Sequence, residues 1–394
     1  MQRIEADPDV GLPNFTCAPA TLISHFDTDM FEDEGAVFDA DSVYGDSTTS
    51  ITSSILRGVD EHGRTYAAYG KSGYGMPIDG DELDRIDMKH RMYSMLLDEE
   101  LFLAPIGSSP HRVLDLGTGS GIWAIEFADQ FPSADVLGVD VAPIQPDWLP
   151  PNCHFEIDDV EEQFTYTRKF DFIHSRDFLF SIKDWPRLVG QCYDQLEPGG
   201  HLELQCLLPV PNCDDDSAPP ESGVPLFSTK VIEASQIVGW SLLEPNNFAK
   251  YLSEAGFVNV VEKRYKVPTG PWPLDKRMKL IGAFEMESLL QGASAFSLMA
   301  FSKAFGWTME QTEVFLVALR RDVKNLRFHT YYEFIVAYGQ RPKNARAGKE
   351  ASPESPTAES PSSPAKTESR GSPAKTVSEG NPAKTESEGN LGKV

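Results

Sequence analysis

The segment 113–123, Val-Leu-Asp-Leu-Gly-Thr-Gly-Ser-Gly-Ile-Trp, constrains the fold of this chain more than any other stretch. An apolar run interrupted only by Asp115 leads directly into Gly117, Gly119 and Gly121, and apolar residues at helical spacing follow. This order predicts a buried strand, a glycine-rich turn and the start of a helix. Such a turn lets the backbone approach a small ligand closely, and a helix start favours a negative group on that ligand.

A second apolar run, residues 136–139, ends in Asp140, which is placed to accept hydrogen bonds from the two hydroxyls of a ribose. Ile122 stands where a dinucleotide fingerprint has glycine or alanine, and the loop has no G-K-[ST] as a P-loop would. Asp115 would repel a pyrophosphate but suits an ammonium group. These features favour S-adenosylmethionine, with its ammonium facing Asp115 and its carboxylate facing the helix start at Gly121.

Further strands extend the predicted site. Residues 154–160 read as a third short strand that ends in two acids. The second of them, Asp159, would accept a hydrogen bond from an adenine amino group, and the Val160 backbone would bond a ring nitrogen. Residues 170–176 read as a fourth strand, and residues 201–207 read as a fifth strand after a Pro-Gly-Gly turn. Because strands alternate with helical segments, we expect an α/β fold with a parallel, doubly wound sheet.

Four sequence motifs between Val113 and Gln205 carry a resemblance to a known family: Leu-Asp-Leu-Gly-Thr-Gly-Ser-Gly-Ile-Trp, Pro-Pro-Asn-Cys, Asp-Trp-Pro-Arg-Leu and Glu-Pro-Gly-Gly-His-Leu-Glu-Leu-Gln. They resemble class I S-adenosylmethionine-dependent methyltransferases, and more narrowly the fungal secondary-metabolism group typified by the LaeA regulator. The resemblance covers residues 50–342, approximately. It implies a doubly wound, seven-stranded, Rossmann-like sheet with an N-terminal lid, and the last two strands of such a sheet are usually joined as a hairpin-like pair.

Together with the resemblance, these patterns give a set of expected cofactor-binding residues. They are Asp115, Gly117, Thr118, Gly119, Gly121, Asp140, Val141, Asp159, Val160, His174, Tyr66 and Arg64. Tyr66 and Arg64 would contact the cofactor from the lid, although the tyrosines of this region would equally suit packing in an N-terminal cap. Trp148 would either cover the adenine or simply pack.

His174, at the predicted tip of the fourth strand, is the candidate catalytic residue. As a base it would remove a proton from an acceptor hydroxyl or amine. The alternatives are that it holds the methionine part of the cofactor or has no chemical role. Arg176 nearby would clamp an acidic acceptor. The reaction itself requires neither a metal ion nor a covalent nucleophile.

Composition divides the chain into three parts. Residues 1–50 are acidic and end in a Ser/Thr-rich run, which predicts a disordered arm. Residues 51–342 are expected to form the methyltransferase domain, with a cap or lid over 51–105 and a helical substrate cover over 267–328. Residues 343–394 are rich in Pro, Ser, Lys and Glu and repeat the unit Pro-Ala-Lys-Thr, which predicts a disordered tail.

Within the central part, helical periodicity predicts four helices outside the sheet layers. They are expected at about 82–101, 231–242, 280–290 and 309–326. Two further strands are predicted over 257–266 and 331–339, and the helix before the first of these is expected to stop at Gly256. The last two helical segments would therefore form the insertion that covers the acceptor.

The formal net charge is −25, from 35 basic and 60 acidic residues, which disfavours direct nucleic-acid binding. The five cysteines include no C-x-x-C pair and give no evident metal site. The sequence has no apolar run long enough for a membrane span and no signal peptide at its start. We therefore expect a cytoplasmic protein, or a nuclear one if it is a regulator, that uses a small-molecule acceptor and has arms available to protein partners.

Three functional hypotheses follow. The first is an enzyme that methylates an oxygen or nitrogen of a small molecule in fungal secondary metabolism. The second is a LaeA-like regulatory protein that keeps the fold and acts through protein partners. The third, a nucleotide-dependent oxidoreductase, is disfavoured by Ile122.

Overall fold

The computed structural model describes residues 57–70 and 74–344. The predicted acidic arm, 1–50, lies outside the described residues, as does nearly all of the predicted tail, 343–394. The expectations of disorder for these two segments therefore stay predictions.

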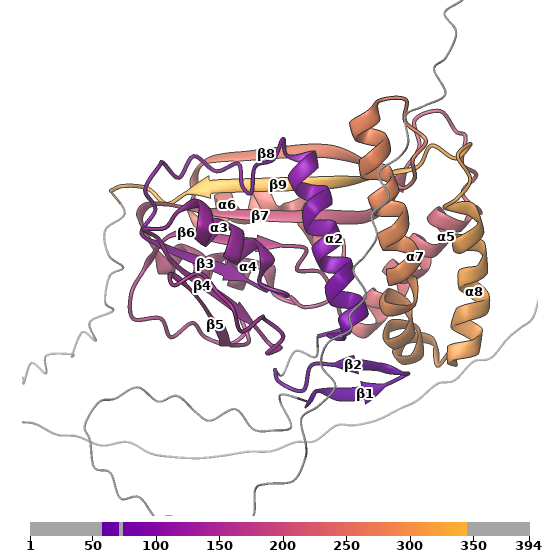
Figure 1. Ribbon diagram of the computed structural model, residues 1–394, viewed down its shortest axis with the longest axis horizontal. Coiled ribbons are helices and arrows are strands. Elements are labelled where there is room, and N and C mark those ends of the chain that lie inside the picture. Colours follow the sequence, from indigo (N-terminus) through magenta and orange to yellow (C-terminus); the bar gives the residue numbers. More distant parts are fainter. Residues whose placement is uncertain (1–56, 71–73, 345–394) are drawn as a thin grey trace, which may run out of the picture.

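Seven strands form one sheet through the centre of the molecule (Figure 1). They are β3 (Arg112–Leu116), β4 (Asp135–Asp140), β5 (Cys153–Ile157), β6 (Phe170–Arg176), β7 (Leu196–Asn212), β8 (Val258–Pro268) and β9 (Tyr331–Gln340). Their order across the sheet is β5-β4-β3-β6-β7-β9-β8, and β9 runs antiparallel to both of its neighbours while the other pairs are parallel. The chain winds outward from β3 in both directions, so the predicted doubly wound seven-stranded sheet is confirmed.

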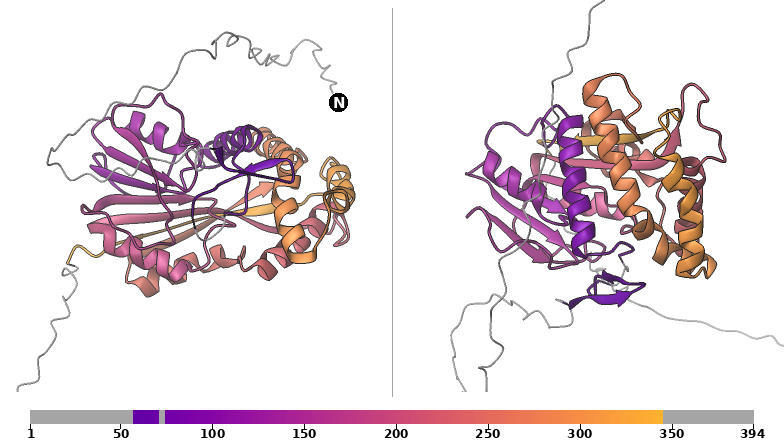
Figure 2. Two further views of the ribbon diagram at one scale, coloured as in Figure 1. Left: turned by 90° about the horizontal axis from the view of Figure 1, so that it is seen from below. Right: turned by 45° about the vertical axis from the view of Figure 1, so that its right-hand side comes forward.

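Helices cover both faces of this sheet (Figure 2). They are α2 (Gly80–Leu96), α3 (Ile122–Gln130), α4 (Trp185–Gln195), α5 (Gly223–Val238), α6 (Phe248–Ala255), α7 (Lys276–Phe305) and α8 (Met309–Asp322), with a short 3₁₀ turn at Glu244–Asn247. The helices α4 and α6 pack on one face with side chains of β3, β6 and β7. On the other face α3 packs on β3, β4 and β6.

The lid and the cover share a second core beside the sheet. The N-terminal segment forms a small hairpin, β1 (Val59–Glu61) with β2 (Arg64–Tyr66), and then α2. Buried side chains of α2 pack with those of α5, α7 and α8 and with residues of β7 and β9. Because α7 and α8 lie between β8 and β9 in the chain, the predicted insertion between the last two strands is confirmed.

Local signals explain many element boundaries, but several predicted boundaries differ from the structure. The predicted Pro-Gly-Gly turn, for example, lies within β7, which begins at Leu196. Gly256 ends α6 in the left-handed conformation, with φ of 98°, as predicted. The lid helix α2 ends at Leu96, short of the predicted Leu101. The physical reason is that Asp98 and Glu99 take positive φ values of 61° and 66°, which an α-helix does not tolerate.

The insertion is also more helical than its sequence pattern suggested. Asp275 caps α7 by accepting from the Met278 amide at 2.9 Å, and the helix continues through the predicted 280–290 segment for 30 residues. The predicted 231–242 helix begins earlier, at Gly223, and is stopped by Gly239 with φ of 100°. The long α7 can therefore reach across the carboxyl edge of the sheet beside α2 (Figure 1).

Candidate active site

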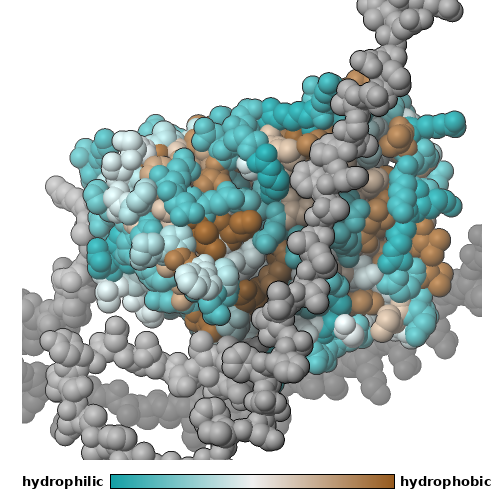
Figure 3. Space-filling view, in the orientation of Figure 1, coloured by the Kyte–Doolittle hydropathy of each residue, from teal (hydrophilic) through white to brown (hydrophobic). Residues whose placement is uncertain are grey.

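A crevice opens along the edge of the sheet where β3, β4 and β6 end. It is lined by the loop between β3 and α3, by residues that follow β4, β5 and β6, and by side chains of α2 and α7. The empty space of the crevice, counted out into the solvent at its open mouth, is about 1210 Å³. Apolar residues gather in this hollow beside α2 (Figure 3). Doubly wound sheets bind their ligands at this edge, where the direction of winding reverses.

The glycine loop between β3 and α3 forms the floor of the crevice. Gly117, Gly119 and Gly121 have φ values of 66°, 58° and 81°, a region that side chains disfavour. The amides of Gly117 and Thr118 donate to the Val139 carbonyl at 2.9 and 3.0 Å. These bonds hold the loop against the end of β4, which brings the first acid of the site close to the second.

Gly119 and Gly121 meet different surroundings. A Cβ atom at Gly119 would approach only Ile86, at 3.9 Å, so this glycine borders open space. A Cβ atom at Gly121 would lie 2.4 Å from the Phe155 ring. Gly121 begins α3 and lets it pack close to the sheet, and it does not line the crevice. Its expected contribution to the cofactor therefore comes through the helix start.

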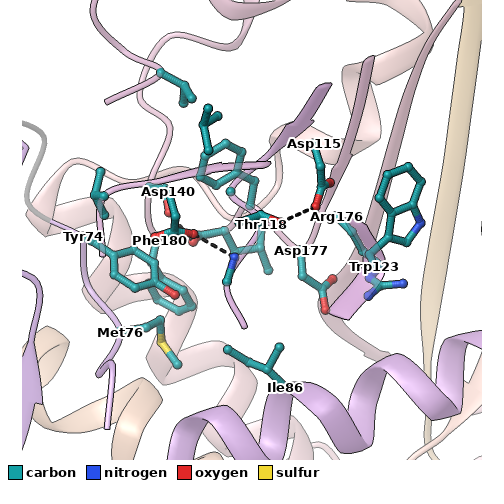
Figure 4. Close-up of a pocket in the computed structure, with 18 of the residues that line it drawn as sticks. Tyr74, Met76, Ile86, Asp115, Thr118, Trp123, Asp140, Arg176, Asp177 and Phe180 are labelled. Carbon is teal, nitrogen blue, oxygen red and sulfur yellow. Dashed lines mark hydrogen bonds between the residues drawn. The ribbon is translucent and has the colours of Figure 1, made fainter. Parts of the chain in front are cut away.

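Asp140 lies at the end of β4 and points into the crevice (Figure 4). Its carboxylate oxygens accept from the Gly119 amide at 2.8 Å and from the Ala142 amide at 3.0 Å. Burial raises the pKa of Asp140 to about 6. Each oxygen keeps a second lone-pair site, so the side chain can also accept from the hydroxyls of a ribose.

Asp115 and His174 form a buried pair on the adjacent strands β3 and β6. One Asp115 oxygen accepts from the Thr118 hydroxyl at 2.7 Å, and the other lies 2.7 Å from Nδ1 of His174. His174 is fully buried, and its ring stacks on Trp123 with centroids 3.8 Å apart. Burial lowers the pKa of His174.

The structure thus does not place His174 at an exposed strand tip, as expected for a catalytic base. Its ring nevertheless lines the crevice. Asp115 occupies Nδ1 and the indole of Trp123 covers one face, whereas Nε2 has no hydrogen-bond partner among the described residues. The role of His174 as a base therefore stays a prediction, beside the alternatives that it holds the methionine part of the cofactor or has no chemical role.

The residues expected at the adenine end lie together. Val141, Asp159 and Val160 all line the crevice. The lid passes directly over them, since a Cβ atom at Gly70 would lie 3.2 Å from the Asp159 carboxylate and 3.3 Å from Val141. The expectation for Trp148 is wrong in both of its forms, because its side chain is 93% exposed.

Arg64 and Tyr66 lie on β2 and do not line the crevice. Arg64 donates to both carboxylate oxygens of Asp79, at 2.6 and 2.7 Å, and Asp79 caps the start of α2. Tyr66 is buried, with 3% of its surface exposed. The direct cofactor contacts expected of these two residues are therefore absent from the described arrangement, because Arg64 is engaged in fixing the lid helix. Tyr74, further along the lid, lines the crevice instead.

The sequence analysis missed the polar face that α2 turns to the crevice. Its members line the crevice: Glu82, Arg85, Lys89 and Tyr93 follow one another at spacings of three or four residues, and His90 is adjacent to Lys89. That spacing was the available signal, because it puts the side chains on one face of a helix. Charged residues at such positions are mostly solvent-exposed, which hid their significance.

Two residues of this face bind Asp177, which follows β6. The Lys89 ammonium lies 2.8 Å from one Asp177 oxygen, and the Tyr93 hydroxyl donates to the same oxygen. The other oxygen accepts from the Leu207 amide at 2.9 Å. Although burial opposes it, Lys89 and Tyr93 hold the pKa of Asp177 below its usual value. Asp177 is therefore an ionised acceptor fixed in the wall of the crevice (Figure 4).

Within residues 57–70 and 74–344, no three His, Cys, Asp or Glu side chains lie together as a metal site would require. None of the helices described there is long and apolar enough to cross a membrane.

The fold and the site together define a class. A sheet of this order, a glycine loop after the central strand, and carboxylates at the ends of the next two strands are the features of S-adenosylmethionine-dependent methyltransferases. A protein-family model described as a methyltransferase domain matches residues 88–264.

Known proteins narrow the assignment. Methyltransferase pytC of Aspergillus terreus is 39% identical over 306 residues, which cover 77% of this chain and 94% of that protein. The probable methyltransferase tdiE of Emericella nidulans is 34% identical, covering 66% of this chain and 82% of tdiE. The secondary metabolism regulator LAE1 of Cochliobolus heterostrophus is 31% identical, covering 72% of this chain and 94% of that protein. The chain belongs to this family of fungal secondary-metabolism methyltransferases and LaeA-type regulators.

Proposed function

We propose that this protein transfers the methyl group of S-adenosylmethionine to an oxygen or nitrogen atom of a small molecule. The observation that carries the proposal is the convergence of Asp115, Asp140 and Asp159 on one crevice, which Gly119 also lines without filling it. The crevice is shaped on its other side by α2 and α7, which leaves room for a second ligand beside the cofactor.

In this proposal each acid meets one part of the cofactor. Asp140 accepts from the ribose hydroxyls, Asp159 and the Val160 backbone meet the adenine, and Asp115 faces the ammonium group. The remaining contacts come from the backbone or side chains of Gly117, Thr118 and Val141. The buried acids suit a ligand that carries two positive charges, because each charge offsets the desolvation of a carboxylate.

When bound, S-adenosylmethionine supplies a methyl group on a positively charged sulfur, which an acceptor attacks in line. The residues of the chain contribute alignment and the exclusion of water. Met76, Phe180 and Phe296 form an apolar wall, and the rings of Phe180 and Phe296 stack with centroids 6.0 Å apart. This wall suits the apolar body of an acceptor.

The attacking group of the acceptor needs a partner for its proton. We assign that role to the carboxylate of Asp177, which lines the same crevice and is held ionised by Lys89 and Tyr93. His174 then acts through Asp115, by fixing the orientation of its carboxylate. The first of these assignments places acid–base chemistry directly after β6.

A second candidate function is regulatory. LAE1 of Cochliobolus heterostrophus and laeA of Gibberella zeae, both 31% identical to this chain, are named secondary metabolism regulators. In that case the protein would act through protein partners and would work in the nucleus, whereas the enzyme would work in the cytoplasm. The acids of the crevice support cofactor binding equally in the two cases.

The experiment that separates them follows the methyl group. Full-length protein is incubated with radiolabelled S-adenosylmethionine and a fractionated extract of fungal small molecules. The enzyme is expected to label a discrete small molecule, and Asp140→Ala is expected to abolish the labelling. Tight binding of S-adenosylhomocysteine without transfer to any fraction would favour the regulator instead.

A further inference from the structure

Arg176, the last residue of β6, is a cation in the crevice wall that lacks an acidic partner in the described part of the chain. The other lysine and arginine side chains of the wall are paired: Arg85 donates to Glu82 at 2.9 Å, and Lys89 binds Asp177 at 2.8 Å. Arg176 instead donates to a histidine and lies over the Tyr93 ring, 5.3 Å from its centroid. A partly buried charge is costly unless a counter-ion is supplied, and a ligand bound in this crevice would supply one.

His90 fixes the guanidinium of Arg176 through a hydrogen bond. An arginine only donates hydrogen bonds, so Nδ1 of His90 must accept from Arg176, at 2.7 Å. Nε2 therefore carries the hydrogen and donates to Glu126 of α3 at 2.9 Å. Burial, assisted by Arg176, lowers the pKa of His90 to about 4, so the ring stays neutral. One nitrogen of Arg176 is thereby fixed, and its remaining N–H groups are available to the crevice.

The position of Arg176 in the sheet shows which part of a ligand it would meet. Ser175 pairs with Leu116 across β6 and β3, so Arg176 lies level with the first glycine of the loop. Through His90 it is linked to α3, whose first turn also lines the crevice with Ile122 and Trp123. The start of a helix carries unpaired N–H groups and a partial positive charge. Two positive features thus converge on one end of the crevice (Figure 4).

We propose that Arg176, together with the start of α3, binds the carboxylate at the methionine end of S-adenosylmethionine, and that His90 is the residue that positions its guanidinium. This inference rests on the proposed function, in which the crevice holds that cofactor. A carboxylate on the acceptor offers the same chemistry, and binding measurements made without an acceptor separate the two sources.

The test compares two ligands that differ by one carboxyl group. Calorimetry measures the affinity of the full-length protein for S-adenosylhomocysteine and for S-adenosyl-3-thiopropylamine, which lacks the carboxyl group. The wild-type protein is expected to prefer the first by more than about tenfold, the usual effect of a charge-assisted hydrogen bond. In Arg176→Gln this preference should fall at least about tenfold, with the affinity for the second ligand unchanged.

Arg112, the first residue of β3, provides a matched control. Arg112 also lies over an aromatic ring, that of Phe170 at 4.6 Å, but it pairs with Asp135 and does not line the crevice. Arg112→Gln should keep the preference of the wild-type protein. Arg176→Lys retains the charge and should keep part of the preference, and His90→Phe should reduce it, because the guanidinium loses its support.

The possible results separate the two proposals. A wild-type preference that survives in Arg176→Gln, with S-adenosylhomocysteine still bound, overturns the role of Arg176 and leaves the cofactor assignment intact. Failure of the wild-type protein to bind S-adenosylhomocysteine at all overturns both. Equal weakening of both ligands in Arg176→Gln would mean that the residue only supports the fold, and would also overturn the proposal.

Discussion

Asp140 combines three properties in one side chain: it is buried, it is held by two backbone amides, and its pKa is raised to about 6. Burial and the nearby charge of Asp115 both favour its protonated form, whereas ribose hydroxyls need the ionised form as acceptor. Its ability to bind the cofactor is therefore complete above that pKa and is lost as the pH falls below it.

The corresponding prediction concerns affinity as a function of pH. The dissociation constant for S-adenosylhomocysteine should rise as the pH is lowered from about 8 to about 5, by approximately tenfold per unit below the pKa. Asp140→Asn should bind at least tenfold more weakly at neutral pH, approximately the loss of one charged hydrogen bond, and should lack this pH dependence. Calorimetry at several pH values checks both, and a flat profile in the wild-type protein would contradict the assignment.

Two roles are open to His174: it either orients the carboxylate of Asp115 or acts as a catalytic base. His174→Phe keeps the stack on Trp123 but removes the hydrogen bond to Asp115. We expect the free energy of unfolding to fall by about 1–3 kcal/mol, because a buried carboxylate loses a partner. Denaturant titration measures this change. If His174→Phe instead keeps the stability of the wild-type protein and loses the acidic limb of the turnover profile, the role of a catalytic base would be restored.

At the scale of elements, two glycines of the loop between β3 and α3 serve different purposes: one matters for cofactor binding and the other for folding. Gly119→Ala should leave the domain folded, with a loss of about 1–2 kcal/mol of stability because of its positive φ. It should strongly lower the affinity for the cofactor, because it places a methyl group in the crevice. Gly121→Ala should instead disrupt the packing of α3 on Phe155. Thermal unfolding and calorimetry together distinguish them, and identical behaviour of the two variants would be inconsistent with the geometry.

Elements whose signals are local could be predicted from the sequence. The strand before Gly117, the strand that ends at Asp140 and the stop at Gly256 were each encoded by adjacent residues. The end of α2 was not, because the backbone conformation of Asp98 and Glu99 has no distinctive sequence signal.

Of the candidate site, only the floor, which is formed by the glycine loop and the acids beside it, could be predicted from the sequence. Asp115 and Asp140 follow directly from strand ends beside a glycine loop, whereas the pairing of Lys89 with Asp177 depends on how α2 packs across the sheet. The burial of His174 likewise depends on Trp123, a residue from a different element. Contacts between distant segments require the tertiary structure, and they form most of the acceptor side of the crevice.

At the scale of the whole molecule, the lid, the cover and the sheet share one core. Phe334 of β9 is fully buried and stacks on Tyr93 of the lid helix with ring centroids 4.4 Å apart. The same cluster contains buried residues of α5, α7 and α8. We therefore expect the cover to fold together with the sheet as one unit.

This arrangement predicts one cooperative unfolding transition. Phe334→Ala should lower the stability by about 3–5 kcal/mol, and the loss of cofactor binding should coincide with the loss of secondary structure in denaturant. The control is Leu274→Ala, since Leu274 is 95% exposed and its truncation should change little. Two separated transitions in the wild-type protein would show that the cover folds independently.

The stack of Trp123 on His174 has a practical consequence. This indole is 2% exposed, lies face to face on an imidazole and forms part of the crevice wall. Indole fluorescence responds to charges placed beside it, so arrival of a sulfonium ion at this wall should alter the emission of the protein. Occupancy could then be followed optically without any label, with Trp123→Phe providing the blank.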